Sequence, residues 1–350
     1  MTECENLLRA VRFESPDHIP MVFHINAACW HHYPQDDLEA LMADHPILFP
    51  EFERSTRRVE LNSDRDVRAN RSFVDPWGCT RDTGIDGIAT VVTRHALTDW
   101  DDLPDFRAPD PATSTGAGPI DWQAVEAQFA ATIAAGGLPR GGLNHGHTYL
   151  TLSDVRGYEN LTYDMADDEP RLWQLIEMVE AFNAESVRRY IEAGAQWMGY
   201  ADDLGMQEGP MMSPTHFRKY LKPSYGRLIA PAREAGCIVH MHSDGDIREL
   251  ADDILDAGVE VINLQDLVNG LDWLEARLAG KVCIELDIDR QSVTPYGTPE
   301  QIDALVREEV ERLGSREGGL MMIYGLYPEV PLANAAALMD AMERYSTYYS

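Results

Sequence analysis

From about residue 120 to the C-terminus, helix signals alternate with short apolar runs, and this alternation limits the folds open to the chain. Four glycines mark turns between a predicted helix and the apolar run that follows it: Gly194, Gly236, Gly258 and Gly280. Strand–helix alternation sustained over more than 200 residues predicts a parallel sheet covered by helices.

The predicted strands are 19–24, 138–143, 195–200, 238–242, 259–263, 282–286 and 320–324. The predicted helices are 121–135, 170–193, 247–257, 271–278, 299–313 and 334–345, with a helix or helix pair between Ser213 and Gly236. The first 120 residues are less regular. We expect one α/β domain over residues 1–350, a single (β/α)8 TIM barrel with an irregular N-terminal extension. A doubly wound sheet is the alternative, but no G-x-G-x-x-G motif follows a predicted strand.

The sequence turns polar at the C-terminal end of each of six predicted strands. The residues are His145 and His147, Asp202 and Asp203, His242 and Asp244, Asn263 and Gln265, Asp287 and Asp289, and Tyr324. In a barrel these strand ends converge on one cavity, so the pattern predicts a site there.

Composition excludes several classes of partner and location. The chain carries 59 acidic and 29 basic residues, for a formal charge of −30, and such a field repels nucleic acid and anionic lipid. No apolar run approaches the roughly 20 residues of a membrane span. The acidic N-terminus lacks signal-peptide features, and the five cysteines are scattered without a C-x-x-C pair. A cytoplasmic protein with reduced thiols is expected.

His242 and Asp244 are separated by one residue at a predicted strand end. An imidazole and a carboxylate at this spacing could bind one divalent cation. The alternative is that they bond to each other or cap the helix that begins near Asp246.

Other strand ends offer carboxylates and a phenol. Asp202 and Asp203 are adjacent, so at most one faces the cavity directly, where it could bind metal, act as a base or orient a cation. Glu285 and Asp287 share one face of their strand. Tyr324 could donate a proton to a substrate oxygen or only fill the barrel. No G-x-S-x-G, P-loop or H-E-x-x-H motif is present.

Seven segments, spread over nearly the whole chain, follow the order of a known family pattern. They are Leu8–Pro20, Asp75–Cys79, Arg156–Leu161, Asp202–Gln207, His242–Ile247, Gly297–Glu300 and Pro328–Asn334. In these segments the chain resembles the uroporphyrinogen decarboxylase superfamily, which includes cobalamin-linked methyltransferases. The resemblance implies a (β/α)8 barrel with its site at the strand C-termini.

Two departures from the family pattern bear on the chemistry. True uroporphyrinogen decarboxylases carry an arginine-bearing R-Q-A-G-R-Y motif after the first strand, whereas residues 24–30 here contain no arginine. Asp75 falls where the decarboxylase aspartate would, but Tyr324 occupies the position of its histidine. Porphyrin is therefore not the expected substrate.

The zinc methyltransferases of the family bind metal through His-x-Cys and a later cysteine. This chain has His242-x-Asp244 and no cysteine near Tyr324, so the resemblance implies a histidine and carboxylate set with a third ligand from Glu208, Asp203 or Glu285. Such ligands suit a substrate that presents oxygen, with Zn²⁺ as Lewis acid. The expected reaction moves a methyl group from a small methoxylated or methylated molecule to a corrinoid protein.

These considerations assign three sets of residues. The expected catalytic residues are His242, Asp203 and Tyr324. The expected substrate-binding residues are Asp75, His147, Asp202, Gln207, Asn263, Gln265 and Asp287. The expected metal ligands are His242, Asp244, Glu208 and Glu285. The expected partners are a small methyl donor and a corrinoid protein, with neither nucleic acid nor membrane; a homo-oligomer is compatible with the sequence. The rival functions are a metal-free decarboxylase for a small carboxylic acid, using Asp75 and His242 as acid and base, and a non-catalytic ligand-binding barrel.

Overall fold

The computed structural model describes residues 1–55, 57, 69–84 and 90–350. The chain forms two compact units. Unit 1 comprises residues 1–71, 83–90 and 264–350, and unit 2 comprises residues 72–82 and 91–263. The expectation of a single domain over 1–350 stays a prediction.

The main sheet confirms the expected α/β architecture of the TIM-barrel type. Its seven strands follow the order β1-β12-β11-β10-β9-β6-β5, which is one strand fewer than a complete (β/α)8 barrel has. The strands are β1 Met21–Ile25, β5 Arg140–Gly142, β6 Trp197–Ala201, β9 Ile238–Ser243, β10 Val261–Gln265, β11 Cys283–Asp287 and β12 Leu320–Leu326. Among the described residues between β1 and β5, the only strands form a separate three-stranded antiparallel sheet.

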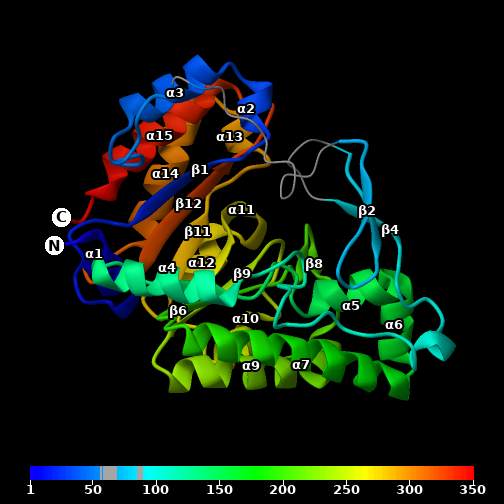
Figure 1. Ribbon diagram of the computed structural model, residues 1–350. Helices are drawn as coiled ribbons and strands as arrows, with labels where there is room; N and C mark the ends of the chain where they lie inside the picture. The colour runs from blue at the N-terminus through cyan, green and yellow to red at the C-terminus, as the bar shows by residue number, and fades with distance from the viewer. Residues whose placement is uncertain (56, 58–68, 85–89) are drawn as a thin grey trace. The chain divides into compact units, whose positions relative to one another are not determined.

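In unit 1, β1 and β11 each pair in parallel with β12. The other elements are α1 Glu3–Arg12, α2 Cys29–His32, α3 Gln35–Asp44, α11 Asp266–Asn269, α12 Leu271–Arg277, α13 Val293–Tyr296, α14 Pro299–Leu313 and α15 Leu332–Ser346. Helices α14 and α15 pack against each other (Figure 1). Helix α14 begins with a capping box in which Thr298 and Gln301 bond to each other's backbone amide groups.

In unit 2, β5 and β9 each pair in parallel with β6. The other strands are β2 Ser72–Val74, β3 Thr80–Asp82, β4 Val91–Arg94, β7 Gly205–Met206 and β8 Gly209–Pro210. The helices are η1 Trp100–Asp102, α4 Trp122–Ala134, α5 Tyr149–Arg156, α6 Tyr158–Ala166, α7 Pro170–Glu192, α8 Pro214–His216, η2 Phe217–Leu221, α9 Lys222–Glu234 and α10 Ala251–Asp256. The long helices α7 and α9 lie side by side (Figure 1).

Helix α7 shows how the sequence builds these elements. Its first residue is Pro170, preceded by Glu169, whose side chain accepts a hydrogen bond from the Arg171 amide. One face of the helix is buried, including Leu172, Leu175 and Val179. Gly194 follows the helix at φ +99°, a left-handed conformation that favours glycine.

Two helices of unit 2 differ from the expected boundaries. The segment after Ser213 runs through one π-helical turn, η2, into α9, and Pro231 lies inside α9 without ending it. The helix expected from residue 247 begins only at Ala251, after a turn. No helix in the described part of the chain is long and apolar enough to cross a membrane.

Candidate functional site

Three side chains of unit 2 meet beyond the C-terminal ends of neighbouring parallel strands. His145 follows β5 by three residues, Asp203 follows β6 by two, and His242 is the penultimate residue of β9. Their potential ligand atoms all lie within 4.8 Å of one another. This was the only such group of three or more His, Cys, Asp or Glu side chains found in the described residues.

Strand geometry accounts for the position of His242. Exposure alternates along the second half of β9, where Met241 and Ser243 are buried while His240 and His242 are partly exposed. The His242 side chain is 18% exposed and that of Asp203 is 22% exposed, whereas His145 is 53% exposed. The three side chains therefore lie at the C-terminal ends of buried strands, where they are partly accessible to solvent.

Asp203 is the centre of the group. Its Oδ1 lies 3.0 Å from His145 Nε2 and 3.4 Å from His242 Nε2. The same oxygen accepts a hydrogen bond of 3.0 Å from the Asp244 amide. The two imidazole rings stand nearly perpendicular, at 75°, with centroids 5.2 Å apart.

Neighbouring side chains fix the His242 ring. Its Nδ1 is hydrogen-bonded to the side-chain oxygen of Asn263, which leaves Nε2 directed at Asp203. Asp244 Oδ1 lies 3.8 Å from His242 Nε2, a longer approach than that of Asp203. A hydrogen bond to the other ring nitrogen is what typically orients a metal-binding histidine.

The pKa values of Asp203 and His242 are shifted in opposite directions from their ordinary values. Burial lowers the pKa of His242, but its hydrogen bond to Asp203 and the charge of Asp244 outweigh burial and raise that pKa to about 9. Burial raises the pKa of Asp203, but its contacts with His145 and His242 hold it well below the ordinary range. Without a metal, the pair is an imidazolium beside a carboxylate at neutral pH.

Asp202, the neighbour of Asp203, points the other way and is fully buried. Its carboxylate accepts hydrogen bonds from the amides of Tyr149 and Leu150, at 2.7 and 3.1 Å, and from the Tyr225 hydroxyl at 2.5 Å. Two of these donors are the first amides of α5, so Asp202 holds that helix to the end of β6. Its expected contact with substrate stays a prediction.

His147, expected to bind substrate, is buried, with only 3% exposure. Its Nδ1 is 2.6 Å from the Thr148 hydroxyl, and its Nε2 has no hydrogen-bond partner among the described residues. Burial lowers the pKa of His147, which keeps the ring neutral. Its substrate contact likewise stays a prediction.

Asp75 lies at the turn between β2 and β3, and both of its oxygens are engaged. Oδ1 accepts the Cys79 amide at 2.9 Å, and Oδ2 accepts Arg81 Nε at 2.6 Å. Arg81 also contacts Asp154 at 2.5 Å.

Gln207 and Glu208 are exposed at the β7–β8 turn. The three-residue group includes neither Asp244 nor Glu208 nor Glu285, so their assignment as metal ligands stays a prediction.

The remaining expected site residues belong to unit 1. Gln265, Glu285, Asp287 and Tyr324 are all buried. Arg290 Nη2 lies 2.6 Å from Asp287 Oδ2. The Tyr324 hydroxyl has no hydrogen-bond partner in the described part of the chain, and burial raises its pKa. Whether these residues share a cavity with Asp203 and His242 stays a prediction.

The sequence reading missed two residues of interest. The sequence places both His145 and His147 at a strand end, with only Gly146 between them, and we assigned substrate binding to His147 alone. Arg290 received no role, yet it is a largely covered cation, with 19% side-chain exposure, beside a buried carboxylate. An arginine after Asp287 and Asp289 at a strand end was the available signal.

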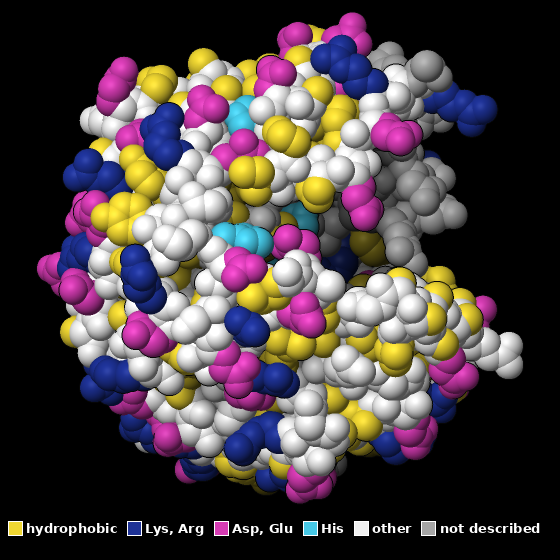
Figure 2. All heavy atoms as spheres, turned by 90° about the vertical axis from the view of Figure 1, so that its left-hand side faces the viewer, with side chains coloured by type: hydrophobic (Ala, Val, Ile, Leu, Met, Phe, Trp, Pro, Cys, Tyr) yellow, Lys and Arg dark blue, Asp and Glu magenta, His cyan; other side chains and the backbone are white. Residues whose placement is uncertain are grey.

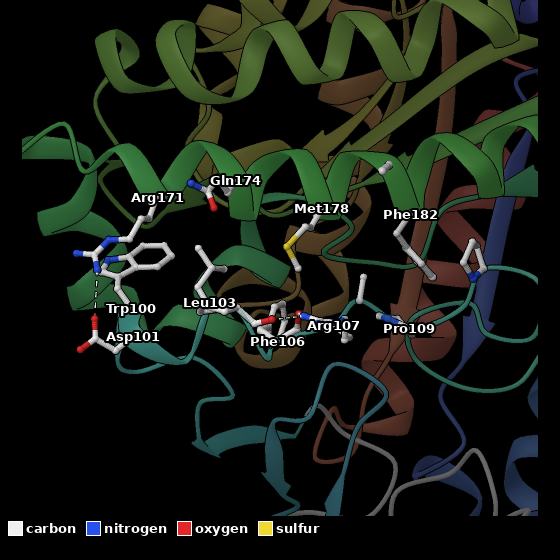
Figure 3. Close-up of a pocket in the computed structure, with 14 residues that line it drawn as sticks. Trp100, Asp101, Leu103, Phe106, Arg107, Pro109, Arg171, Gln174, Met178 and Phe182 are labelled. Atoms are coloured by element: carbon white, nitrogen blue, oxygen red, sulfur yellow. Dashed lines mark hydrogen bonds and ion pairs between the residues drawn. The ribbon is translucent and has the colours of Figure 1, made fainter.

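A cavity of about 940 Å³ in unit 2 does not include the three-residue group. Figure 3 shows it between α7, which contributes Arg171, Met178 and Phe182, and the segment around Leu103 and Phe106. Its lining is mainly apolar. On the face in Figure 2, basic side chains are scattered among acidic ones, and histidines lie beside acidic groups.

Comparisons with known proteins identify the family. The family model described as uroporphyrinogen decarboxylase (URO-D) matches residues 90–345. A uroporphyrinogen decarboxylase of Thermus thermophilus is 28% identical over 183 residues, covering 50% of this chain and 49% of the relative. The human uroporphyrinogen decarboxylase is 24% identical over 164 residues, covering 45% and 42%. The chain thus matches about half the length of these curated relatives.

A solved structure shares the fold over the whole chain. It is a methyltransferase from Methanosarcina mazei, with a TM-score of 0.66 and 18% sequence identity, and the match covers 99% of each chain. The expected superfamily and fold are confirmed.

Proposed function

Because the chain belongs to the uroporphyrinogen decarboxylase family, we propose that it is an enzyme that transfers a methyl group from a small O-methylated molecule to a corrinoid protein, with help from a bound cation. The methyltransferase with the same fold supports the reaction class. The observation that carries the proposal is the group formed by His145, Asp203 and His242 at the strand ends.

The donor atoms of this group fit a cation that activates oxygen. They are imidazole nitrogens and a carboxylate oxygen, and no cysteine belongs to the group. A bound divalent cation would act as a Lewis acid on the ether or alkoxide oxygen of the substrate.

The chain's own residues would hold and orient the substrate oxygen. Asn263 fixes the His242 ring, and the Asp244 amide fixes the Asp203 carboxylate, so the two groups meet the substrate in one arrangement. Asp202, and not Asp203, accepts the hydrogen bonds from the first amides of α5, so holding this helix does not occupy the Asp203 carboxylate.

A metal-free decarboxylase is the second candidate, with Asp75 and His242 as acid and base. The structure gives it less support, because both Asp75 oxygens are already bonded, to the Cys79 amide and to Arg81. A non-catalytic ligand-binding barrel would show neither activity.

The test uses free cob(I)alamin as methyl acceptor and a panel of methoxylated aromatic and aliphatic compounds as donors. We expect at least one donor to convert the cob(I)alamin spectrum to that of methylcobalamin in the presence of the protein. His242→Ala should abolish this conversion, and His31→Ala, at an exposed residue of α2, should keep it. Release of CO₂ from a small carboxylic acid, with no methyl transfer from any donor, would support the decarboxylase instead.

A further inference from the structure

The three-residue group has the geometry of adjacent ligands around one metal ion. Two ligand atoms that are each about 2.1 Å from an ion, at right angles, lie about 3 Å apart. The two nitrogen-to-Asp203 distances, 3.0 Å for His145 and 3.4 Å for His242, match this spacing. All three ligand atoms lie within 4.8 Å of one another.

Each ligand comes from a different strand end, which makes the arrangement part of the fold. β5, β6 and β9 are hydrogen-bonded neighbours in this order, and their registers place the three strand ends together. The His145 segment is tied to this edge because the Gly146 amide donates to the Ala201 carbonyl at 2.8 Å. Loop movement is therefore not needed to bring the ligands together.

Orienting contacts act on two of the three ligands. Asn263 bonds to Nδ1 of His242, and the Asp244 amide bonds to Asp203. Such contacts position ligands before the ion arrives and typically change metal affinity 10- to 100-fold when they are removed.

We propose that His145, Asp203 and His242 together bind one divalent transition-metal ion through two imidazoles and one carboxylate, with the remaining coordination positions open to substrate oxygen. Neither the family resemblance nor the sequence pattern assigns His145 to a metal, and the set contains no thiolate. Two histidines and one carboxylate with open positions form a recognised ligand class for ions that prefer five or six ligands. The metal site would be the cation site of the proposed methyl transfer. Only the binding of a substrate oxygen to the ion rests on that proposed function.

Asp244 has a different part in this site. Its backbone amide orients Asp203, while its carboxylate lies 3.8 Å from His242 Nε2. Its side chain therefore contributes charge near the ion and is not one of the three ligands.

The experiment measures metal binding without turnover. The purified full chain is stripped with a chelator and titrated with Mn²⁺, and free Mn²⁺ is followed by its electron paramagnetic resonance signal. We expect one Mn²⁺ per wild-type chain, at least tenfold weaker binding in His145→Ala and Asp203→Asn, and wild-type binding in His31→Ala. Circular dichroism checks that the variants are folded; His145 is more than half exposed, so its replacement should not disturb the fold.

A second probe reports the ligand type. Co²⁺ bound to the wild-type chain should show the weak visible absorption of a five- or six-coordinate ion, with no thiolate charge-transfer band. Equal Mn²⁺ affinity in wild type and His145→Ala, or a thiolate band with Co²⁺, would overturn the inference. If Mn²⁺ binds as described but no methyl donor reacts with cob(I)alamin, the metal site stands and the proposed function fails.

Discussion

Asp203 and His242 form a partly exposed acid–base pair, and the protonation of each depends on the other. Asp203 raises the pKa of His242 to about 9 against the effect of burial, and His145 and His242 together lower the pKa of Asp203. The adjacent Asp202 has no part in this pair, because its oxygens are bonded to α5 and Tyr225. Two neighbouring carboxylates thus have a chemical and a structural role, which their opposite directions from the strand explain.

The pair predicts the effect of Asp203→Asn on His242 in the metal-free protein. Only Asp244 and the hydrogen bond to Asn263 would then act against burial, so the pKa of His242 should fall by about one unit or more from about 9. Nuclear magnetic resonance titration of the histidine side chains measures this directly. Asp256→Asn, at an exposed residue bonded to Lys222, is the control and should leave the His242 titration unchanged.

The sign of the linked stability follows from the raised pKa. The contribution of protonated His242 to stability is fully present below its ordinary pKa of 6.5 and is lost as the pH rises through about 9. An Asp203→Asn variant in which the His242 pKa remains near 9 would show that Asp203 is not its main partner.

At the scale of elements, a buried carboxyl pair connects α14 to α11. Glu309 on α14 and Asp266 at the start of α11 are 0% and 1% exposed. Neither Glu309 oxygen has a hydrogen-bond donor among the described residues, while Asp266 accepts the amides of Leu267 and Asp289. Burial, and then the charge of Asp266, raise the pKa of Glu309 well above its ordinary value, so Glu309 keeps its proton beside the Asp266 carboxylate.

Glu309→Gln should remove a pH dependence of stability. The folded protein keeps a proton on Glu309 that the unfolded chain releases above pH 4.5, so the contribution of Glu309 to wild-type stability falls as the pH rises, by up to about 1.4 kcal/mol per pH unit. Glutamine has nearly the same shape as protonated glutamic acid but does not titrate. In urea denaturation from pH 5 to 8, the free energy of unfolding of Glu309→Gln should therefore increase relative to that of wild type as the pH rises.

The control for this prediction is Glu308→Gln, the neighbouring residue on α14, which contacts Arg312 at the surface. Because Glu308 has only the smallest effect on the pKa of Glu309, this variant should stay much closer to the wild-type dependence on pH than Glu309→Gln does. Parallel curves for wild type and Glu309→Gln would mean that Glu309 is ionised in the folded protein.

Elements were more predictable from the sequence than contacts between side chains. The helices predicted over residues 299–313 and 170–193 match α14 and α7 to within one residue. The helix predicted from residue 247 begins only at Ala251, because residues 248–250 form a turn. The sequence could not tell whether His145 or His147 belongs to the site. Both lie in the same loop, and only the folded structure shows that His147 is buried and His145 is exposed.

At the scale of the whole molecule, the charge of −30 bears on the substrate. The residues after β1, from Asn26 to Trp30, contain no arginine that could hold the carboxylates of a porphyrin. We predict that the purified protein releases no coproporphyrinogen from uroporphyrinogen above the blank. The Thermus thermophilus relative serves as the positive control in the same chromatographic assay. Release at a rate comparable to that control would mean that the chain is a porphyrin decarboxylase despite the missing arginines.

The central claim is that a cation held at His242 and its neighbours assists methyl transfer, and one paired measurement tests it most directly. Elemental analysis and the cob(I)alamin methylation assay are run on the same preparations of wild type and His242→Ala. We predict that wild type carries metal and transfers methyl groups, and that His242→Ala loses both while remaining folded, because the residue lies at the strand end outside the core. Full activity in a metal-free wild type, or a variant that keeps both metal and rate, would contradict the account.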